Sequence, residues 1–323
     1  MPIARTVLVL AGCSVLLTAE PLPSLDLAVT KIADLIRTHY VFEDRGRQIA
    51  EALLEDYRAG RFSGSKTWTE FAEAATKRLQ EVSKDGHLYV RHDPAVVRDQ
   101  LAEAAGAAAK KEGAGEDPFY YGASAREGNY GFREVRVVDG NIGYIKLSEI
   151  NISRASLTTL FAALDFVAFT KALVLDLRDN GGGGSDIGPV IESLFLPPNR
   201  LLLEFRNRSG VVDQSRTVSW LTRPIYSKPL FLLVNGKTGS AAEALAFALQ
   251  SQRRAVVLGQ RSAGAAHMNS WYVVNADVYV SVSTGAPTLP WSTVTWEGVG
   301  VKPDRVLKEG ESWAEAVSST INH

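Results

Sequence analysis

Apolar residues recur at helical spacing through the first quarter of the chain. Three such series are Leu27, Ile32, Leu35, Ile36 and Tyr40; Ile49, Leu53, Leu54 and Tyr57; and Phe71, Leu79 and Val82. Apolar positions three or four residues apart are typical of amphipathic helices. The third helix starts near Thr69 and should stop at Lys84-Asp85-Gly86, with Gly86 as its candidate C-terminal cap. We therefore predict a helical N-terminal domain over residues 20–92, with an extended segment directly after Gly86.

Beyond Gly131 the pattern changes to short apolar runs separated by turn residues. Asp139-Gly140 between residues 135–138 and 142–145 predicts a β-hairpin. Further strands are predicted at 172–177, 230–234, 255–258, 271–274 and 278–282, and helices at 187–195 and 244–249. Strands that alternate with helices indicate an α/β domain, which we place at residues 126–323.

The segment between these two regions has a biased composition. Ala, Gly, Lys and Glu dominate residues 103–116 and give way to Phe119, Tyr120 and Tyr121. Such bias is typical of flexible connections, so we predict a flexible linker over residues 93–125.

Composition narrows the class of protein further. The chain has 323 residues, enough for about two domains, with 46% hydrophobic and 22% charged residues, as in ordinary globular proteins. The formal net charge is −1 and no basic stripe is present, so we expect no nucleic-acid partner. A single cysteine, Cys13, rules out an intrachain disulfide and a cysteine-rich metal site.

The first residues form their own pattern, in which Arg5 is followed by an uncharged apolar stretch. Residues 1–19 therefore predict an export signal, and hence a periplasmic or extracellular protein. Leu10-Ala11-Gly12-Cys13 resembles the lipobox of bacterial lipoproteins, in which the cysteine is lipidated; the alternative is a signal cut after Ala19. No later stretch is long and apolar enough for a transmembrane helix, so a lipid anchor at Cys13 is the one membrane contact expected.

Ser240 lies where the predicted strand at 230–234 passes into the helix at 244–249. Its small neighbours, Gly239, Ala241 and Ala242, would let a substrate approach closely. Free N–H groups and the dipole at a helix N-terminus favour negative charge, such as the oxyanion of acyl transfer. Ser240 and Glu243 also match the S-x-x-E pattern of a helix cap. The segment alone leaves both interpretations open, a nucleophile and a cap.

A run of four glycines, at residues 181–184, follows the predicted strand at 172–177. Exposed N–H groups in such a run can hold an anion or a peptide carbonyl oxygen, although a merely permissive turn explains the run as well. A phosphate-binding loop is not expected, because the Gly-Lys-Ser/Thr ending is missing.

Two histidines and one glutamate are candidates for proton transfer. His87 follows a glycine at a helix end, and His267 lies in a turn of small residues; either could act as general base. Spacing does not choose between them. Glu297, between Trp296 and Gly298, could orient an imidazole or could be an exposed turn residue.

Together these segments resemble the serine peptidase family of the C-terminal-processing (tail-specific) proteases and tricorn protease, in the branch similar to interphotoreceptor retinoid-binding protein. The matching motifs are Asp85-Gly-His87, Gly143-Tyr-Ile145, Leu175-Asp-Leu-Arg-Asp-Asn-Gly-Gly-Gly183, Gly239-Ser-Ala-Ala-Glu243, Gly259-Gln-Arg-Ser-Ala-Gly264 and Gly298-Val-Gly-Val-Lys-Pro-Asp304. The resemblance runs from about Leu25 to Leu307, and six motifs in the family's order are specific.

The resemblance implies a crotonase-like ββα spiral for the catalytic domain, preceded by the helical domain. The short segment after His92 leaves no room for the PDZ domain of the tail-specific branch. Ser240 falls on the nucleophile position. Ala265 stands where tail-specific proteases carry a lysine, so a Ser-Lys dyad is not expected.

Tricorn-like members use a histidine and a distant glutamate instead, and His87 and Glu297 match these positions. His267 is kept as the alternative base. Gly182 or Gly183, with the N–H of Ala241, would form the oxyanion hole.

The sequence thus predicts an exported serine peptidase that cleaves peptides or unfolded proteins through a Ser-His-Glu arrangement, with no metal or cofactor. The alternative is a non-catalytic carrier of hydrophobic ligands such as retinoids or fatty acids. Candidate lining residues for such a carrier are Trp271, Trp291, Trp296 and Phe132.

Overall fold

The structure is a computed structural model that describes residues 22, 24–104, 117–308 and 310–321. The predicted export signal at residues 1–19, with Cys13, lies outside the described residues, as does most of the biased segment at 103–116.

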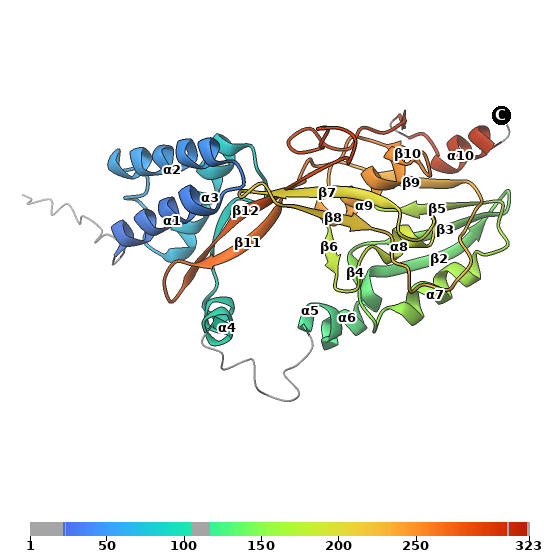
Figure 1. The fold of residues 1–323 in the computed structure, drawn as a ribbon, viewed down its shortest axis with the longest axis horizontal. Coiled ribbons are helices and arrows are strands. Elements are labelled where there is room, and N and C mark those ends of the chain that lie inside the picture. The colour runs from blue at the N-terminus through green and yellow to red at the C-terminus, as the bar shows by residue number, and fades with distance from the viewer. Residues whose placement is uncertain (1–21, 23, 105–116, 309, 322–323) are drawn as a thin grey trace, which may run out of the picture.

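The N-terminal part forms a helical lobe, seen in blue in Figure 1. It consists of α1 (Leu25–His39), α2 (Glu43–Arg58), α3 (Trp68–Ser83) and the short strand β1 (Tyr89–His92). The amphipathic series predicted from the sequence point inward, since Ile32, Ile36 and Ile49 are fully buried. The expected cap is wrong in one detail: Lys84, not Gly86, ends α3 in the left-handed conformation, with φ 60°.

The core of this lobe is completed by a hairpin from near the other end of the chain. Strands β11 (Met268–Val273) and β12 (Val278–Thr288) pair antiparallel, and β1 pairs with β12 on its other side. Val278, Val280 and Val282 lie in the same buried cluster as the helices. The lobe is therefore not made of residues 20–92 alone.

Strand β12 also links the two lobes. Its last residues, Gly285–Thr288, pair with β7 (Leu201–Asn207), which in turn pairs with β8 (Val212–Arg216). Figure 1 shows this long ribbon running from the helical lobe into the larger lobe. One antiparallel sheet, in the order β1-β12-β7-β8 with β11 on β12, thus crosses the junction.

The larger lobe is built on a six-stranded sheet in the order β13-β10-β9-β5-β3-β2. These strands are β2 (Phe132–Val138), β3 (Ile142–Leu147), β5 (Ala172–Asp176), β9 (Leu230–Val234), β10 (Val256–Gly259) and β13 (Arg305–Val306). All neighbours are parallel except the β2–β3 hairpin, which is the hairpin predicted at Asp139-Gly140. Parallel strands are covered on both faces, which explains why β5 and β9 are buried throughout and apolar except for Asp176 at the end of β5.

Helices cover the two faces of this sheet. The side chains of α7 (Leu157–Phe166) and α9 (Ser240–Ser251) pack into one buried cluster, with Leu173 and Leu175 from β5. On the opposite face α10 (Trp313–Ile321) packs against Val174 and Phe231. This layered α/β arrangement confirms the predicted mixture of strands and helices.

Smaller elements lie around the end of the sheet where its parallel strands finish. They are β4 (Ile150–Ile152) and β6 (Gly183–Ser185), paired with each other, the helices α5 (Pro118–Tyr121), α6 (Ala123–Glu127) and α8 (Val190–Ser193), and a 3-10 turn at Asn129–Gly131. The helix α4 (Pro94–Ala104) instead follows β1 and lies against the β11–β12 hairpin (Figure 1). The helix predicted at 187–195 is therefore shorter than expected. Parts of the segment predicted as a linker are helical.

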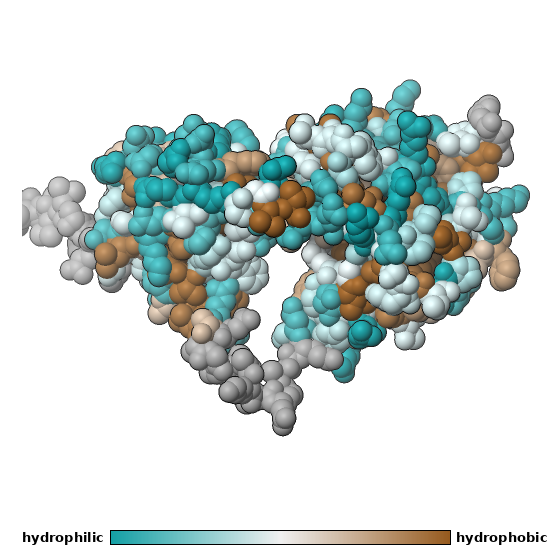
Figure 2. Space-filling model, viewed as in Figure 1, coloured by the Kyte–Doolittle hydropathy of each residue, from teal (hydrophilic) through white to brown (hydrophobic). Residues whose placement is uncertain are grey.

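Within the described ranges, none of the helices has the length and apolarity needed to cross a membrane. Figure 2 shows hydrophilic residues over most of both lobes, with hydrophobic ones grouped where the lobes meet and over part of the larger lobe.

Candidate active site

Ser240 is held by a compact turn after β9. Thr238 closes the turn, because its N–H donates to the Asn235 carbonyl oxygen at 2.9 Å and its hydroxyl to the Leu177 carbonyl oxygen at 2.8 Å. Ser240 begins α9 with φ 50°, a left-handed conformation that is uncommon for residues other than glycine. Backbone strain of this kind is concentrated at functional sites.

The helix-cap interpretation of Ser240 holds for its backbone but not for its hydroxyl. The carboxylate of Glu243 accepts the Ser240 N–H at 3.0 Å, and Gly239, the residue at the N-cap position, has no side chain to cap the helix. Glu243 is fully buried and also accepts the N–H groups of Gly264 at 2.7 Å and Ala265 at 2.8 Å. Glu243 therefore fixes the turn and leaves the serine hydroxyl free for another partner.

That partner is His87, whose Nε2 lies 3.2 Å from the Ser240 Oγ. His87 stands between α3 and β1, in the helical lobe. The Asp85 carboxylate accepts its backbone N–H at 2.9 Å, and the hydroxyl of Ser281 on β12 donates to its carbonyl oxygen at 2.6 Å. Two residues 153 positions apart are thus brought together across the junction of the lobes.

The glycine run lies directly against Ser240. Gly182 has φ 113°, and a Cβ at this position would lie 2.7 Å from the Ser240 Cβ and 3.1 Å from the Ala241 nitrogen. The Ala241 N–H, in the first turn of α9, has no carbonyl partner within the helix. The Gly182 N–H is already donated to Asn180 Oδ1 at 2.9 Å. The space that a Cβ would fill therefore borders the side chain of Ser240 and the N–H of Ala241.

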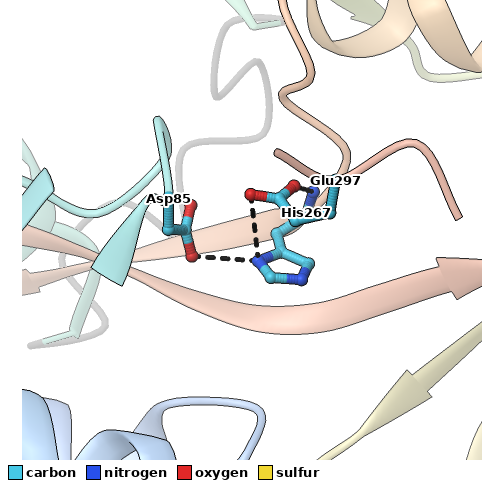
Figure 3. Close-up of side chains that lie close together, drawn as sticks. All are labelled: Asp85, His267 and Glu297. Atoms are coloured by element: carbon cyan, nitrogen blue, oxygen red, sulfur yellow. Dashed lines mark hydrogen bonds and ion pairs between the residues drawn. The ribbon is translucent and has the colours of Figure 1, made fainter. Parts of the chain in front are cut away.

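Glu297 lies next to His267 (Figure 3), and it forms no hydrogen bond or ion pair with His87. Its Oε2 accepts the N–H groups of Ala266 at 2.6 Å and His267 at 3.0 Å, and its Oε1 is 3.7 Å from His267 Nδ1. Nδ1 of His87 is buried without a hydrogen-bond partner among the described residues. The structure thus pairs Ser240 with His87 and Glu297 with His267, without a direct contact between the two pairs.

Asp85 connects the two pairs, a role that the sequence did not reveal. Its Oδ2 accepts a hydrogen bond from His267 Nδ1 at 2.9 Å and one from the Tyr40 hydroxyl at 2.9 Å, while Oδ1 holds the His87 N–H. An aspartate two residues before a histidine commonly bonds to that backbone N–H, which is a signal that the sequence did contain. Its partners Tyr40 and His267 are remote in sequence and could not be foreseen.

Comparison with known proteins assigns the chain to a family. The model of peptidase family S41 matches residues 141–307, about half of the chain, and the model of the N-terminal domain of S41 peptidases in eukaryotic IRBP matches residues 18–115. The chain belongs to peptidase family S41.

Two curated relatives of this S41 chain are processing proteases. The carboxyl-terminal-processing peptidase 1 of Arabidopsis thaliana chloroplasts is 31% identical over 51% of the chain, which covers 33% of that protein. The carboxy-terminal-processing protease of Bartonella bacilliformis is 29% identical over 53% of the chain and 40% of its own length. The S41 chain therefore spans well under half the length of these relatives.

A solved structure shares the fold over most of the chain. The photosystem II D1 C-terminal processing protease superposes with a TM-score of 0.51 and 17% identity, covering 89% of the S41 chain and 94% of the other.

The two histidines of the S41 site have opposite pKa shifts. Burial lowers the pKa of His87, and the charge of His267 lowers it further, against the effect of Asp85. Burial would also lower the pKa of His267, but its hydrogen bond and charge attraction to Asp85, with the charge of Glu297, outweigh burial and raise it. The surroundings therefore favour the uncharged form of His87, as a general base requires, and the charged form of His267.

The two carboxylates differ as well. Burial raises the pKa of Glu297, assisted by the charge of Asp85 and opposed by His267. Burial acts in the same direction on Asp85, but its hydrogen bonds and the charge of His267 lower its pKa to about 2.

Asp85, His267 and Glu297 offer three ligand atoms within 4.8 Å of one another, so they are the described residues that could hold a metal ion. The ring nitrogen Nδ1 of His267 is already engaged by Asp85 Oδ2 at 2.9 Å, and it lies 3.7 Å from Glu297 Oε1.

A cavity of about 480 Å³ opens beside Ser240. It is lined by Ala241, Ala244 and Leu245 of α9 and by Ile150 and Gly183 across from them. The aromatic residues predicted to line a carrier pocket do not line it. Trp296 and Phe132 are buried in the core of the larger lobe, and Trp271 and Trp291 are exposed.

Proposed function

We propose that this S41 protein is a serine peptidase that hydrolyses peptide bonds in peptides or unfolded proteins. The contact of His87 Nε2 with Ser240 Oγ at 3.2 Å carries the proposal, because it places a neutral base within reach of a hydroxyl at a helix N-terminus.

Ser240 Oγ attacks the carbonyl carbon while its proton passes to His87 Nε2. The oxyanion is stabilised by the N–H of Ala241 and by the glycine run; Gly183 is the better donor, since the Gly182 N–H is engaged. His87 then gives the proton to the leaving amine. Water, activated by the same base, hydrolyses the acyl-enzyme and returns the proton to Ser240.

Glu297 is our proposed third member, and its described contacts support an indirect action. The negative charge of Glu297 favours the charged form of His267, which binds Asp85, and Asp85 holds the backbone of His87. In this arrangement Glu297 positions the base through two intermediate residues. The negative charge of Asp85 also stabilises the imidazolium of His87 that forms in the reaction.

The proposal is tested by labelling with a fluorophosphonate and by peptide hydrolysis. Ser240→Ala should abolish both, whereas Ser251→Ala, at the far end of the same helix, should leave both unchanged. Ser240→Ala should hardly change the folding midpoint, since the hydroxyl caps nothing. Glu297→Gln should lower kcat more than it raises KM, because its charge matters most once the imidazolium has formed. Labelling of the Ser240→Ala protein would refute the assignment.

The same proteins also test the carrier hypothesis. Stoichiometric binding of retinol or oleate that does not depend on Ser240, together with no cleavage of any peptide library, would replace the peptidase with a carrier.

Two further features of the protein belong to this proposal. A crotonase-like ββα spiral for residues 126–323 is supported by the parallel strands with α7 and α9 on one face. Export is supported by the apolar stretch before Cys13, with a lipid anchor at that cysteine. In a bacterial host, Cys13→Ser should move the protein from the membrane fraction to the soluble fraction. A mature N-terminus at Glu20 would instead show secretion without an anchor.

A further inference from the structure

One acidic side chain in the cavity takes no part in the proposed chemistry. Glu192, on α8, lines the same cavity as Ser240. Its neighbours in the lining are mostly apolar and include Ile152, Val190 and Phe205, and neither lysine nor arginine lines the cavity. Among the lining residues, His267 alone can carry a positive charge, and its Nδ1 is bound to Asp85.

The Glu192 carboxyl has no partner that would explain its place. Among the described residues it forms no ion pair, and its hydrogen bond comes from its own backbone N–H. Burial raises its pKa to about 7. A cation that binds beside such a buried carboxyl would stabilise its ionised form, because a neighbouring positive charge favours the carboxylate.

Apolar residues of α9 line the cavity beside Ser240. Ala244 and Leu245 line the cavity one turn of α9 beyond Ser240, about 6 Å along the helix axis at 1.5 Å per residue. α8 packs against α9. Ser240 and Glu192 thus line one cavity whose walls include apolar residues of α9.

We propose that Glu192 selects substrates with a lysine or arginine side chain next to the scissile bond. Both side chains combine an apolar stem, which would lie against the cavity walls, with a cationic head for the carboxylate. This inference rests on the proposed peptidase function and names its substrate class.

Binding tests the inference without any turnover. The full chain with Ser240→Ala is titrated with acetyl-Ala-Ala-X-Ala-Ala-amide, where X is lysine, arginine or methionine. Lysine and arginine peptides should bind about tenfold more tightly than the methionine peptide, or better, as for a hydrogen bond between charged groups. Adding Glu192→Gln should bring this ratio close to one. The control Glu204→Gln, on β7 outside the cavity lining, should keep it.

Equal affinities, no measurable binding of the basic peptides, or a preference that survives Glu192→Gln would each overturn the inference. Hydrolysis by the wild-type chain separates it from the proposed function. Cleavage with no preference for basic residues would refute the role of Glu192 and leave the peptidase function in place. Selective binding without cleavage or labelling of Ser240 removes the peptidase and leaves a cation-selective pocket.

Discussion

Ser240 and His87 meet at one point, but the regions that carry them are built differently. Ser240 stands at the end of β9, a strand buried along its whole length in the middle of the parallel sheet. The buried Glu243 ties its turn to the loop at Gly264 and Ala265. His87 stands in a turn at the edge of the helical lobe, held by the Asp85 carboxylate and the Ser281 hydroxyl.

The difference teaches where the site is vulnerable. The position of Ser240 depends on a buried strand and on the buried Glu243 carboxylate, which accepts backbone N–H groups around the turn. The position of His87 depends on a few polar contacts, and one of them, between Asp85 and His267, requires a proton on the ring nitrogen. Polar substitutions and changes in pH should therefore affect activity mainly through the position of His87.

The largest effect should separate the two histidines. His87→Ala should lower kcat/KM by about six orders of magnitude, as removal of a triad base does. His267→Asn should lower it by about tenfold, through KM because His267 lines the cavity and through kcat because His267 links Glu297 to Asp85. Steady-state kinetics on one peptide provides the measurement. An inactive His267→Asn beside an active His87→Ala would make His267 the base.

A smaller loss of activity should follow from a substitution next to the nucleophile. Gly182→Ala would place a methyl group 2.7 Å from the Ser240 Cβ, in the space proposed for the oxyanion, at a φ of 113°. We expect kcat to fall about 100- to 1000-fold, comparable to the loss of an oxyanion donor. Gly181→Ala is the matched control, because a Cβ there meets nothing within 4 Å. Equal activity of the two variants, with unchanged melting curves, would remove the glycine run from the site.

Much of the fold could be predicted from local pattern. The buried strands β5 and β9, the hairpin at Asp139-Gly140 and the helices of the N-terminal lobe follow from periodicity and turn residues, which act over a few positions. The role of β12 could not be predicted. A strand that completes the core of a lobe some 200 residues earlier in the chain carries no local signal of its partner.

The candidate site divides in the same way. The turn at Ser240 and the glycine run could be predicted from the sequence, because their backbone conformations favour small residues. The pairing of Glu297 with His267 was not visible, because it depends on how the loop at residues 262–267 folds against Asp85 from the other lobe. Motifs gave the residue types, whereas contacts between remote segments set which side chains meet.

The smallest effect is a shift in pH dependence. The positive charge of His267 helps to lower the pKa of His87. Without it, in His267→Asn, the pKa of His87 should rise, so kcat/KM should be lost at a higher pH as the solution is acidified. The control His92→Asn, on the exposed end of β1, should keep the wild-type profile. An unshifted profile in His267→Asn would show that the two rings are not coupled.

His267→Asn should also change how the stability of the fold depends on pH. Because the folded-state pKa of His267 is raised, its bond to Asp85 stabilises the fold fully below the ordinary value of 6.5 and loses this contribution as pH rises through the raised pKa. His267→Asn should therefore cost about 1.5–3 kcal/mol near pH 6, as for a charged hydrogen bond, and less at pH 9. Urea unfolding at the two pH values measures the difference. A cost that grows with pH would mean that the folded state holds His267 neutral, and the polar link between the lobes would then be weaker than its geometry indicates.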